Sequence, residues 1–257
     1  MRTCKVYCTY FGVRRGRVTV SPANATETLE VFKKNIENDM ALDCGVKNMD
    51  IIVVNNNSTT ITHECVDYLN EINGIKTPYG KIVVLERENK GGSLGAFSHA
   101  FDVYGENYDY WVFCEDDIRI TYPRYYEMVV DELQDEKLGF LSFTNINHEG
   151  NSAKTYVSGG FGAARKDVLD KVKVKFGKLR YDEYKNGAYA SDYGGFGHSE
   201  LYFTNPILHM GYELRTPRKA DVIPLADNWY EFPPQAQWYR TKNIEFGDKK
   251  FLAHIGL

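Results

Sequence analysis

The chain has 257 residues, which suits one α/β domain with a substrate-side extension better than two independent domains. Its 43% hydrophobic and 26% charged residues are ordinary for a soluble globular protein, and a chain of this length buries a sizeable core without disulfide or metal staples. The net charge of −4 argues against a nucleic-acid partner.

The cysteine content and the apolar runs bear on the compartment. Five cysteines occur, an odd number with no Cys-x-x-Cys pair, and three of them (Cys4, Cys8 and Cys114) fall in runs typical of core strands. This pattern predicts reduced, buried thiols and hence a reducing compartment. The first residues lack the apolar core of a signal peptide, and no apolar run reaches membrane-spanning length. We therefore expect a cytoplasmic protein without an integral membrane segment.

The first half of the chain alternates strand and helix signals. Apolar, β-branched and aromatic runs predict strands over residues 4–10, 50–54, 81–85 and 108–114. Apolar residues at helical spacing predict helices over residues 26–40, 58–72 and 91–104. Strands separated by helices predict an α/β fold with a mostly parallel central sheet flanked by helices.

The second half is less regular. Residues 137–145 read as a further strand, and residues 156–172 pass from a Gly-rich loop into a helix. Residues 199–214 read as a helix, a glycine stop and a strand. The regular alternation of strands and helices ends near residue 120. We therefore expect a single domain, residues 1–257, with a nucleotide-side half, 1–120, and an acceptor-side half, 121–257.

Ligands of parallel α/β sheets bind beyond the carboxyl ends of the strands, so the residues that follow each strand are the candidates for a site. Here they are amides, glycines, basic groups and acids: Thr9 and Tyr10 at the first strand, Asn55 at the second, Asn89 and Gly91 at the third, and Glu115, Asp116 and Asp117 at the fourth. This set suits a nucleotide together with a divalent cation.

The three consecutive acids are the strongest local signal. Like charges placed side by side at the end of an apolar strand are costly unless a cation or solvent compensates them. Mg²⁺ and Mn²⁺ prefer carboxylate and phosphate oxygens, so the acids could hold either ion against a diphosphate. A solvated acidic turn would have the same sequence.

The remaining motifs each have a functional and a structural interpretation. Glycines before a helix let backbone N–H groups approach a phosphate, or simply form a tight turn. Asn55 could read a base edge or cap a helix. Glu200, at the start of a helix, could be a general base or a residue favoured by the helix dipole. His254 could be a metal ligand or a structural histidine.

These motifs together resemble the family 2 glycosyltransferases of the GT-A fold. The resemblance rests on DIIVVNNNSTT, ENKGGSLGAFSHAFD, YDYWVFCEDDIRI, SGGFGAARKDVLDKV, GHSELYFTNPILHMGYEL and FLAHIGL, which occur in the family's order and cover nearly the whole chain. It implies transfer of a sugar, with inversion, from a nucleotide-sugar donor to a hydroxyl of a glycan or other acceptor. It also implies Mn²⁺ or Mg²⁺ as the cofactor.

The resemblance assigns roles residue by residue. Asp117 would be the principal metal ligand, at the last acidic position of the DXD element, and His254 would complete the metal site or close over the diphosphate. Glu115 would face the donor ribose or sugar, with Asp116 in support. Glu200, counted back from Gly211, would be the general base.

The donor pocket would be formed by the residues at the ends of the first three strands. Thr9, with Tyr10 beside it, would line the base pocket, and Asn89 and Gly91 would sit beside the donor. Asn55 stands where the family usually has an Asp that accepts a hydrogen bond from uracil, so the base stays open.

Two further departures from the family pattern concern the base and the product. Ser199-Glu200 replaces Glu-Asp, which gives the general base a longer arm. The Gln/Arg-x-x-Arg-Trp segment of processive members is absent, which favours a single addition over polymer synthesis. Two other functions stay open: a sugar nucleotidyltransferase, which would usually carry a Gly-rich, basic signature after the first strand, and a non-catalytic nucleotide- or sugar-binding module.

Overall fold

The structure is a computed structural model that describes most of the chain. It describes residues 1–9, 11, 22–57, 61–116, 118–120, 123–143, 146–148, 155–157, 160–181, 197–216, 222–224, 239–241 and 244–246. Only the backbone is described for residues 22–27, 57, 118–119, 147–148, 197–200 and the last three of these ranges.

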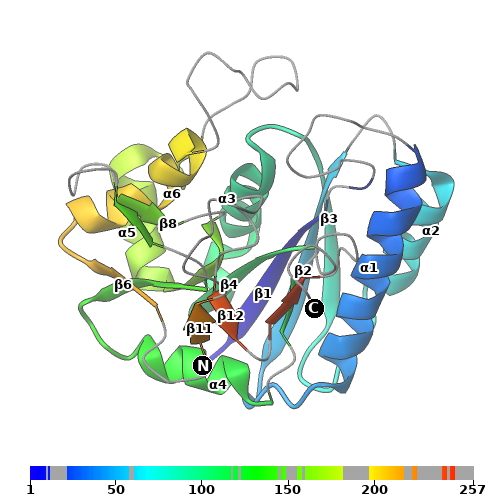
Figure 1. Ribbon diagram of the computed structural model, residues 1–257, viewed down its shortest axis with the longest axis horizontal. Coiled ribbons are helices and arrows are strands. Elements are labelled where there is room, and N and C mark those ends of the chain that lie inside the picture. The colour runs from blue at the N-terminus through cyan, green and yellow to red at the C-terminus, as the bar shows by residue number, and fades with distance from the viewer. Residues whose placement is uncertain are drawn as a thin grey trace.

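In the described part of the chain, a central sheet of seven strands has the order β10-β6-β9-β4-β1-β2-β3 (Figure 1). Its strands are β1 (Thr3–Thr9), β2 (Met49–Asn57), β3 (Ile82–Glu88), β4 (Tyr110–Glu115), β6 (Leu138–Ser142), β9 (Gly162–Arg165) and β10 (Glu213–Arg215). All neighbours pair in parallel except β9, which is antiparallel to both β4 and β6. The carboxyl ends of β1, β2, β3 and β4 therefore meet at one edge.

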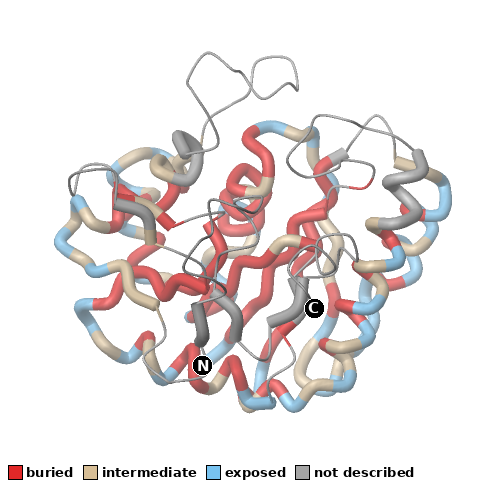
Figure 2. Tube along the Cα trace, viewed as in Figure 1, coloured by how far each residue is buried: buried red, intermediate tan, exposed pale blue. Residues whose placement is uncertain are grey.

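Helices cover both faces of the sheet, and each face has its own apolar core. One core includes residues of α1 (Pro22–Ala41), α2 (His63–Ile72) and α4 (Tyr125–Glu132). The other includes residues of α3 (Gly92–Tyr104), α5 (Lys166–Phe176) and α6 (Gly197–His209). Figure 2 shows the strands buried between these layers.

Alternation along a strand explains why the sheet has a core on each side. Successive side chains of β1 point to opposite faces, so Cys4, Val6 and Cys8 enter the α3 side while Tyr7 enters the α1 side. Phe113 of β4 joins the elements of the α3 side, with its ring centroid 5.0 Å from that of Phe97 and 5.6 Å from that of Phe203. Burying one such ring stabilises the fold by roughly 1.5–3 kcal/mol.

Among the residues that the structure describes, three small two-stranded sheets lie outside the central one. They pair β7 (Ile146–His148) with β8 (Thr155–Val157), β11 (Val222–Pro224) with β12 (Tyr239–Thr241), and β5 (Ile118–Ile120) with β13 (Ile244–Phe246). The β5–β13 pairing is antiparallel and brings a late segment of the chain beside the strand that follows the acidic turn.

The α/β class, the mostly parallel sheet and the flanking helices are confirmed. Strands from both halves of the chain join the one sheet, while the division into donor and acceptor halves stays a prediction. Two features differ from the sequence-based expectation. The second strand was expected to end before the asparagines, but β2 continues through Asn57 because its pairing with β3 continues to Glu88. The Gly-rich segment was expected to be a loop, but it contains the antiparallel strand β9.

All five cysteines are free and buried, as the sequence predicted. Burial raises the pKa of the Cys114 thiol to about 12 and that of the Cys44 thiol to about 11, so both stay protonated at neutral pH.

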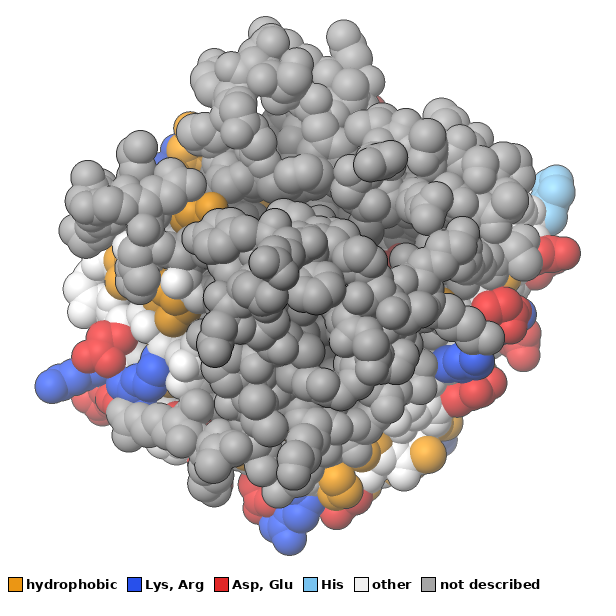
Figure 3. All heavy atoms as spheres, in the orientation of Figure 1, with side chains coloured by type: hydrophobic (Ala, Val, Ile, Leu, Met, Phe, Trp, Pro, Cys, Tyr) orange, Lys and Arg blue, Asp and Glu red, His pale blue; other side chains and the backbone are white. Residues whose placement is uncertain are grey.

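None of the helices in the described part of the chain is long and apolar enough to span a bilayer. Acidic and basic side chains lie next to one another around the rim of the face in Figure 3, as far as that face is described.

Candidate active site

A row of three polar side chains crosses the carboxyl ends of β1, β2 and β3. Thr9 pairs with Asn55, and Asn55 pairs with Glu86, in the register of the parallel strands. The Thr9 hydroxyl donates to Asn55 Oδ1 at 3.3 Å, and Asn55 Nδ2 donates to Glu86 Oε2 at 2.8 Å. The loss of surrounding water raises the pKa of Glu86, and the hydrogen bond from Asn55 opposes this rise. The row fixes the amide of Asn55 in one orientation.

Asn56 points to the opposite face of the sheet and holds the loop that follows β3. Its Nδ2 donates to the carbonyl of Gly92 at 3.1 Å, and its Oδ1 accepts from Arg87 at 2.7 Å. Arg87 also donates to the carbonyl of Lys90 at 2.6 Å. Because strand side chains alternate, Asn55 and Asn56 serve different faces of the same edge.

The glycine loop opens α3 at this edge. Gly91 is the N-cap of the helix, with φ 74° and ψ 19°, a left-handed conformation that favours glycine. A Cβ on Gly95 would lie 2.0 Å from the carbonyl oxygen of Lys90, so any other residue at this helical position would force the loop to shift. The first turn of α3 is thereby held close to the end of β3, and its N-terminus faces the edge.

The acidic turn contacts the same helix start. Glu115, the last residue of β4, accepts a hydrogen bond from the Ser93 hydroxyl at 2.5 Å. Asp116 is 5% exposed, and its backbone N–H donates to the carbonyl of Cys8 at 3.2 Å. The Glu115 carboxylate thus contacts the first turn of α3, and the backbone of Asp116 contacts the end of β1.

The residues predicted for the site have three outcomes. The structure brings one group to the carboxyl edge, as expected: Thr9, Asn55, Asn89, Gly91, Glu115 and Asp116. Tyr10, Asp117 and His254 lie outside the described residues. Glu200 is described only by its backbone, in the first turn of α6.

Helix α6 is positioned by its later residues. The Thr204 hydroxyl accepts from the N–H of Val157 at 3.0 Å, and Asn205 donates to the carbonyl of Thr155 at 3.0 Å. Phe203 packs against Phe97 of α3. These contacts fix α6 against β8 and α3. The first turn of α3 is the one that contacts Glu115.

A divalent cation fits the chemistry of the acidic turn. Carboxylate oxygens from consecutive residues are the hard ligands that Mg²⁺ and Mn²⁺ prefer. Among the described residues, no three His, Cys, Asp or Glu side chains gather closely enough to hold a metal. The predicted ligands Asp117 and His254 are outside that set, so the metal site stays a prediction.

Two residues of the edge were missed by the sequence-based analysis. Glu86 is a strand residue whose role depends on the β2–β3 register, and no local pattern identifies it. Ser93 follows directly on Gly91-Gly92, and a hydroxyl in the first turn of a helix at a strand end could have indicated it.

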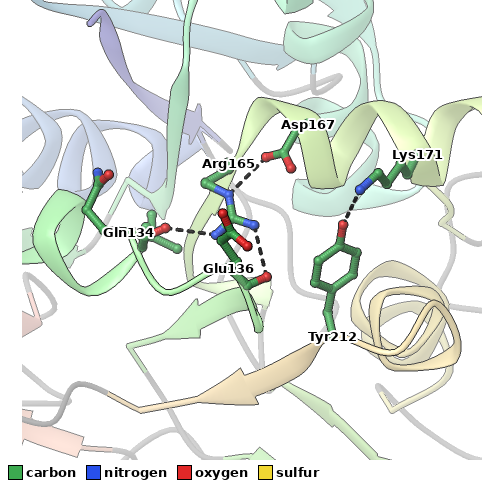
Figure 4. Close-up of a pocket in the computed structure, with 7 residues that line it drawn as sticks. Gln134, Glu136, Arg165, Asp167, Lys171 and Tyr212 are labelled. Carbon is green, nitrogen blue, oxygen red and sulfur yellow. Dashed lines mark hydrogen bonds and ion pairs between the residues drawn. The ribbon is translucent and has the colours of Figure 1, made fainter.

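A separate polar pocket of about 440 Å³ lies at the other edge of the sheet (Figure 4). Arg165, from the end of β9, lines it and donates to the carbonyls of Leu133, Asp135 and Leu138 at 2.8, 2.9 and 3.1 Å. Lys171 points toward the phenol of Tyr212 (Figure 4). Arg165 therefore stabilises the turn between α4 and β6 through these backbone carbonyls. Because its guanidinium is used in this way, the pocket is not the candidate site.

Replacing Gly95 with alanine is expected to lower the free energy of unfolding by roughly 1–3 kcal/mol, because the new Cβ would force the Lys90 carbonyl and Arg87 apart. Chemical denaturation measures this loss. Gly105→Ala is the matched control, since Gly105 is in a right-handed helical conformation and the nearest atom to its Cβ would be in the Phe101 ring, at an ordinary contact distance of 3.6 Å. Equal stability of the two variants would contradict the close approach at Gly95.

Comparison with family models and with curated proteins returned no match. Among solved structures, the chain is similar to the mannosyltransferase PcManGT from Pyrobaculum calidifontis in complex with GDP-Man and Mn²⁺, with 16% identity and a TM-score of 0.49. It is also similar to residues 1–349 of TarS from S. aureus (13%, 0.45) and to a putative nucleotide-diphospho-sugar transferase from Desulfovibrio desulfuricans G20 (11%, 0.44).

These matches cover 84%, 86% and 84% of this chain, and 54%, 59% and 80% of the respective other chains. The chain thus spans little more than half the length of the first two. At these identities the likenesses are similarities of fold alone.

Proposed function

We propose that the protein is a glycosyltransferase of the GT-A type that transfers a sugar from a nucleotide-sugar donor to an acceptor hydroxyl with inversion. The observation that carries the proposal is the convergence of the Thr9–Asn55–Glu86 row, the glycine loop and the Glu115–Asp116 turn at one edge of the sheet. Amides suit a base, a helix start suits phosphates, and carboxylates suit a cation with ribose hydroxyls. Such an edge is where parallel α/β sheets bind ligands.

The donor would be held by the described residues in distinct ways. Thr9 and Asn55 would line the base, and Asn89 with Gly91 would lie beside the donor. Glu115 would accept a hydrogen bond from a ribose or sugar hydroxyl, an orientation supported by its contact with Ser93. Asp116 would support the turn from its buried position.

The cation would be held by Asp117, with His254 as a further ligand, and Tyr10 would lie near the base. When bound, Mn²⁺ or Mg²⁺ neutralises the charge that develops on the departing diphosphate. The pairing of β5 with β13 supports this assignment of His254, because β13 ends eight residues before it and lies beside the strand that follows the acidic turn.

In the proposed reaction, Glu200 takes the proton of the acceptor hydroxyl as its oxygen attacks the anomeric carbon. The bond from that carbon to the donor phosphate oxygen breaks, and its electron pair leaves with the nucleoside diphosphate. Attack from the face opposite the leaving group inverts the anomeric centre.

The proposed location is the cytoplasm. The five buried free thiols are consistent with such a reducing compartment.

A calorimetric screen of UDP-, GDP-, dTDP- and CMP-sugars, with and without Mn²⁺, tests the proposal directly. Metal-dependent binding of one donor, followed by transfer or slow donor hydrolysis, is the expected result. Formation of an activated sugar from a sugar phosphate and a nucleoside triphosphate would indicate a nucleotidyltransferase instead. Binding without transfer or hydrolysis would indicate a binding module.

Replacing Asp117 with alanine is expected to lower the affinity for the donor in the presence of Mn²⁺ by at least about 100-fold. Loss of a residue that only hydrogen-bonds to a metal ligand already lowers metal affinity about 10–100-fold, and loss of the ligand itself should cost more. Titration of the donor with and without Mn²⁺ measures this part. Asp131→Ala, which removes an exposed acid from α4, is the control and should bind as wild type does. Donor affinity in Mn²⁺ that is unchanged in Asp117→Ala would exclude Asp117 as the principal ligand.

A further inference from the structure

Helix α1 carries three polar side chains on the face that it turns toward the sheet. Asn35, Asn38 and Asp39 are spaced by three and four residues, so they share one side of the helix. Asn35 is 0% exposed and Asp39 is 2% exposed. Burying polar groups is costly unless each has a specific partner, so the partners indicate what this face of the helix does.

Two of these side chains hold the segment around the acidic turn. Asn35 Nδ2 donates to the carbonyl oxygen of Asp116 at 2.6 Å, and Asn38 Nδ2 donates to the carbonyl oxygen of Ile120 at 2.7 Å. The first carbonyl belongs to the peptide bond that joins Asp116 to Asp117, and the second closes β5. The two amides therefore bind the backbone on both sides of Asp117.

The third side chain anchors the helix itself. Asp39 accepts from Lys5 Nζ at 2.7 and 2.9 Å and from the Tyr7 hydroxyl at 2.8 Å, which ties α1 to β1. The carbonyl of Cys8 in the same strand accepts from the N–H of Asp116. Helix α1 and strand β1 are thus tied to each other, and both hold the backbone of the acidic turn.

We infer that Asn35 and Asn38 are positioning residues that set the affinity of the acidic turn for the divalent cation. A carboxylate cluster binds a cation tightly only when its backbone is fixed beforehand, because otherwise binding must order the segment. The two amides supply this order through their hydrogen bonds to backbone carbonyls. The ordering of the segment follows from the contacts above, whereas its effect on metal affinity rests on the proposed function.

The test compares Asn35→Ala and Asn38→Ala with Ile36→Val. Ile36 is the apolar neighbour on the same helix, is 5% exposed and packs in the core, so its variant loosens α1 without removing an amide. The first measurement is backbone hydrogen exchange of a peptide spanning residues 115–121, with no nucleotide or metal present. The second is the Mn²⁺ concentration that half-saturates donor binding.

Both asparagine variants are expected to raise the exchange rate of this peptide about fivefold, the effect of losing one typical hydrogen bond. They are also expected to raise the half-saturating Mn²⁺ concentration about five- to tenfold, with metal-free nucleotide binding unchanged. Ile36→Val should change neither quantity beyond its effect on overall stability.

The outcomes separate the two parts of the argument. Exchange in the asparagine variants equal to that in Ile36→Val would overturn the ordering role, whatever the protein binds. Faster exchange with an unchanged Mn²⁺ requirement would overturn the link to metal affinity. A wild-type protein that binds no donor in a metal-dependent way would overturn the proposed function, and the exchange data would still decide the ordering role.

Discussion

Replacing Glu200 with glutamine is expected to lower the rate of sugar transfer by about 10²–10⁴-fold, the usual contribution of a general base. The amide keeps the size and hydrogen-bonding capacity of the side chain but cannot accept the acceptor's proton. Donor affinity should not change, because Glu200 is assigned to the acceptor side of the reaction. Single-turnover kinetics and donor calorimetry on the same protein measure the two quantities separately.

The control for this variant is Glu71→Gln, which makes the same chemical change on an exposed residue of α2. It should transfer sugar at the wild-type rate. A Glu200→Gln enzyme that keeps more than about a tenth of the wild-type rate would exclude Glu200 as the general base. Loss of donor binding in that variant would instead assign Glu200 to the donor site.

The central fold could be predicted because its signals are local. Residues 51–54 and 82–85 are uninterrupted apolar runs, which is the pattern of a strand covered on both faces. The segments between the strands have helical spacing, and a strand-helix-strand order leaves few topologies. Strand β9 was missed because Gly162–Arg165 is short and rich in small residues, so its antiparallel pairing depends on β4 and β6.

The location of the candidate site could be predicted, but its internal contacts could not. The rule that ligands bind beyond the carboxyl ends of parallel strands identified Thr9, Asn55 and Glu115. Whether Asn55 contacts Glu86, and whether Glu115 contacts Ser93, depends on strand register and helix placement between residues 22 or more positions apart. No local spacing contains that information.

The buried ion pair of Lys5 and Asp39 is the clearest example of a contact that local sequence patterns cannot predict. Lys5 lies within a run that reads as an apolar strand, and Asp39 lies in a helix 34 residues later. Both side chains are fully enclosed, and the Lys5 ammonium lies 4.4 Å from the centre of the Tyr7 ring. Proximity to Asp39, together with burial, raises the pKa of Tyr7, with burial as the larger cause.

Replacing Asp39 with alanine is therefore expected to lower the free energy of unfolding by about 3–5 kcal/mol, because the Lys5 ammonium would remain buried without its counter-ion. Urea denaturation at neutral pH measures this change. Asp67→Ala removes an exposed acid from α2 and should change stability by less than about 0.5 kcal/mol. A loss in Asp39→Ala no larger than that of the control would contradict a buried ion pair at this position.

The double variant Lys5→Met with Asp39→Leu separates the cost of an unpaired charge from the value of the pair. Exchanging a whole buried ion pair for apolar side chains of similar volume is often neutral or stabilising, so most of the loss seen in Asp39→Ala should be recovered. The double variant could recover its stability and still need more Mn²⁺ than the wild-type protein. That result would mean that the ion pair of Lys5 and Asp39 sets where α1 lies on the sheet, in addition to stabilising the contact between them. In that case the cost of burying two charges beneath β1 is explained by the alignment of Asn35 and Asn38 with the acidic turn.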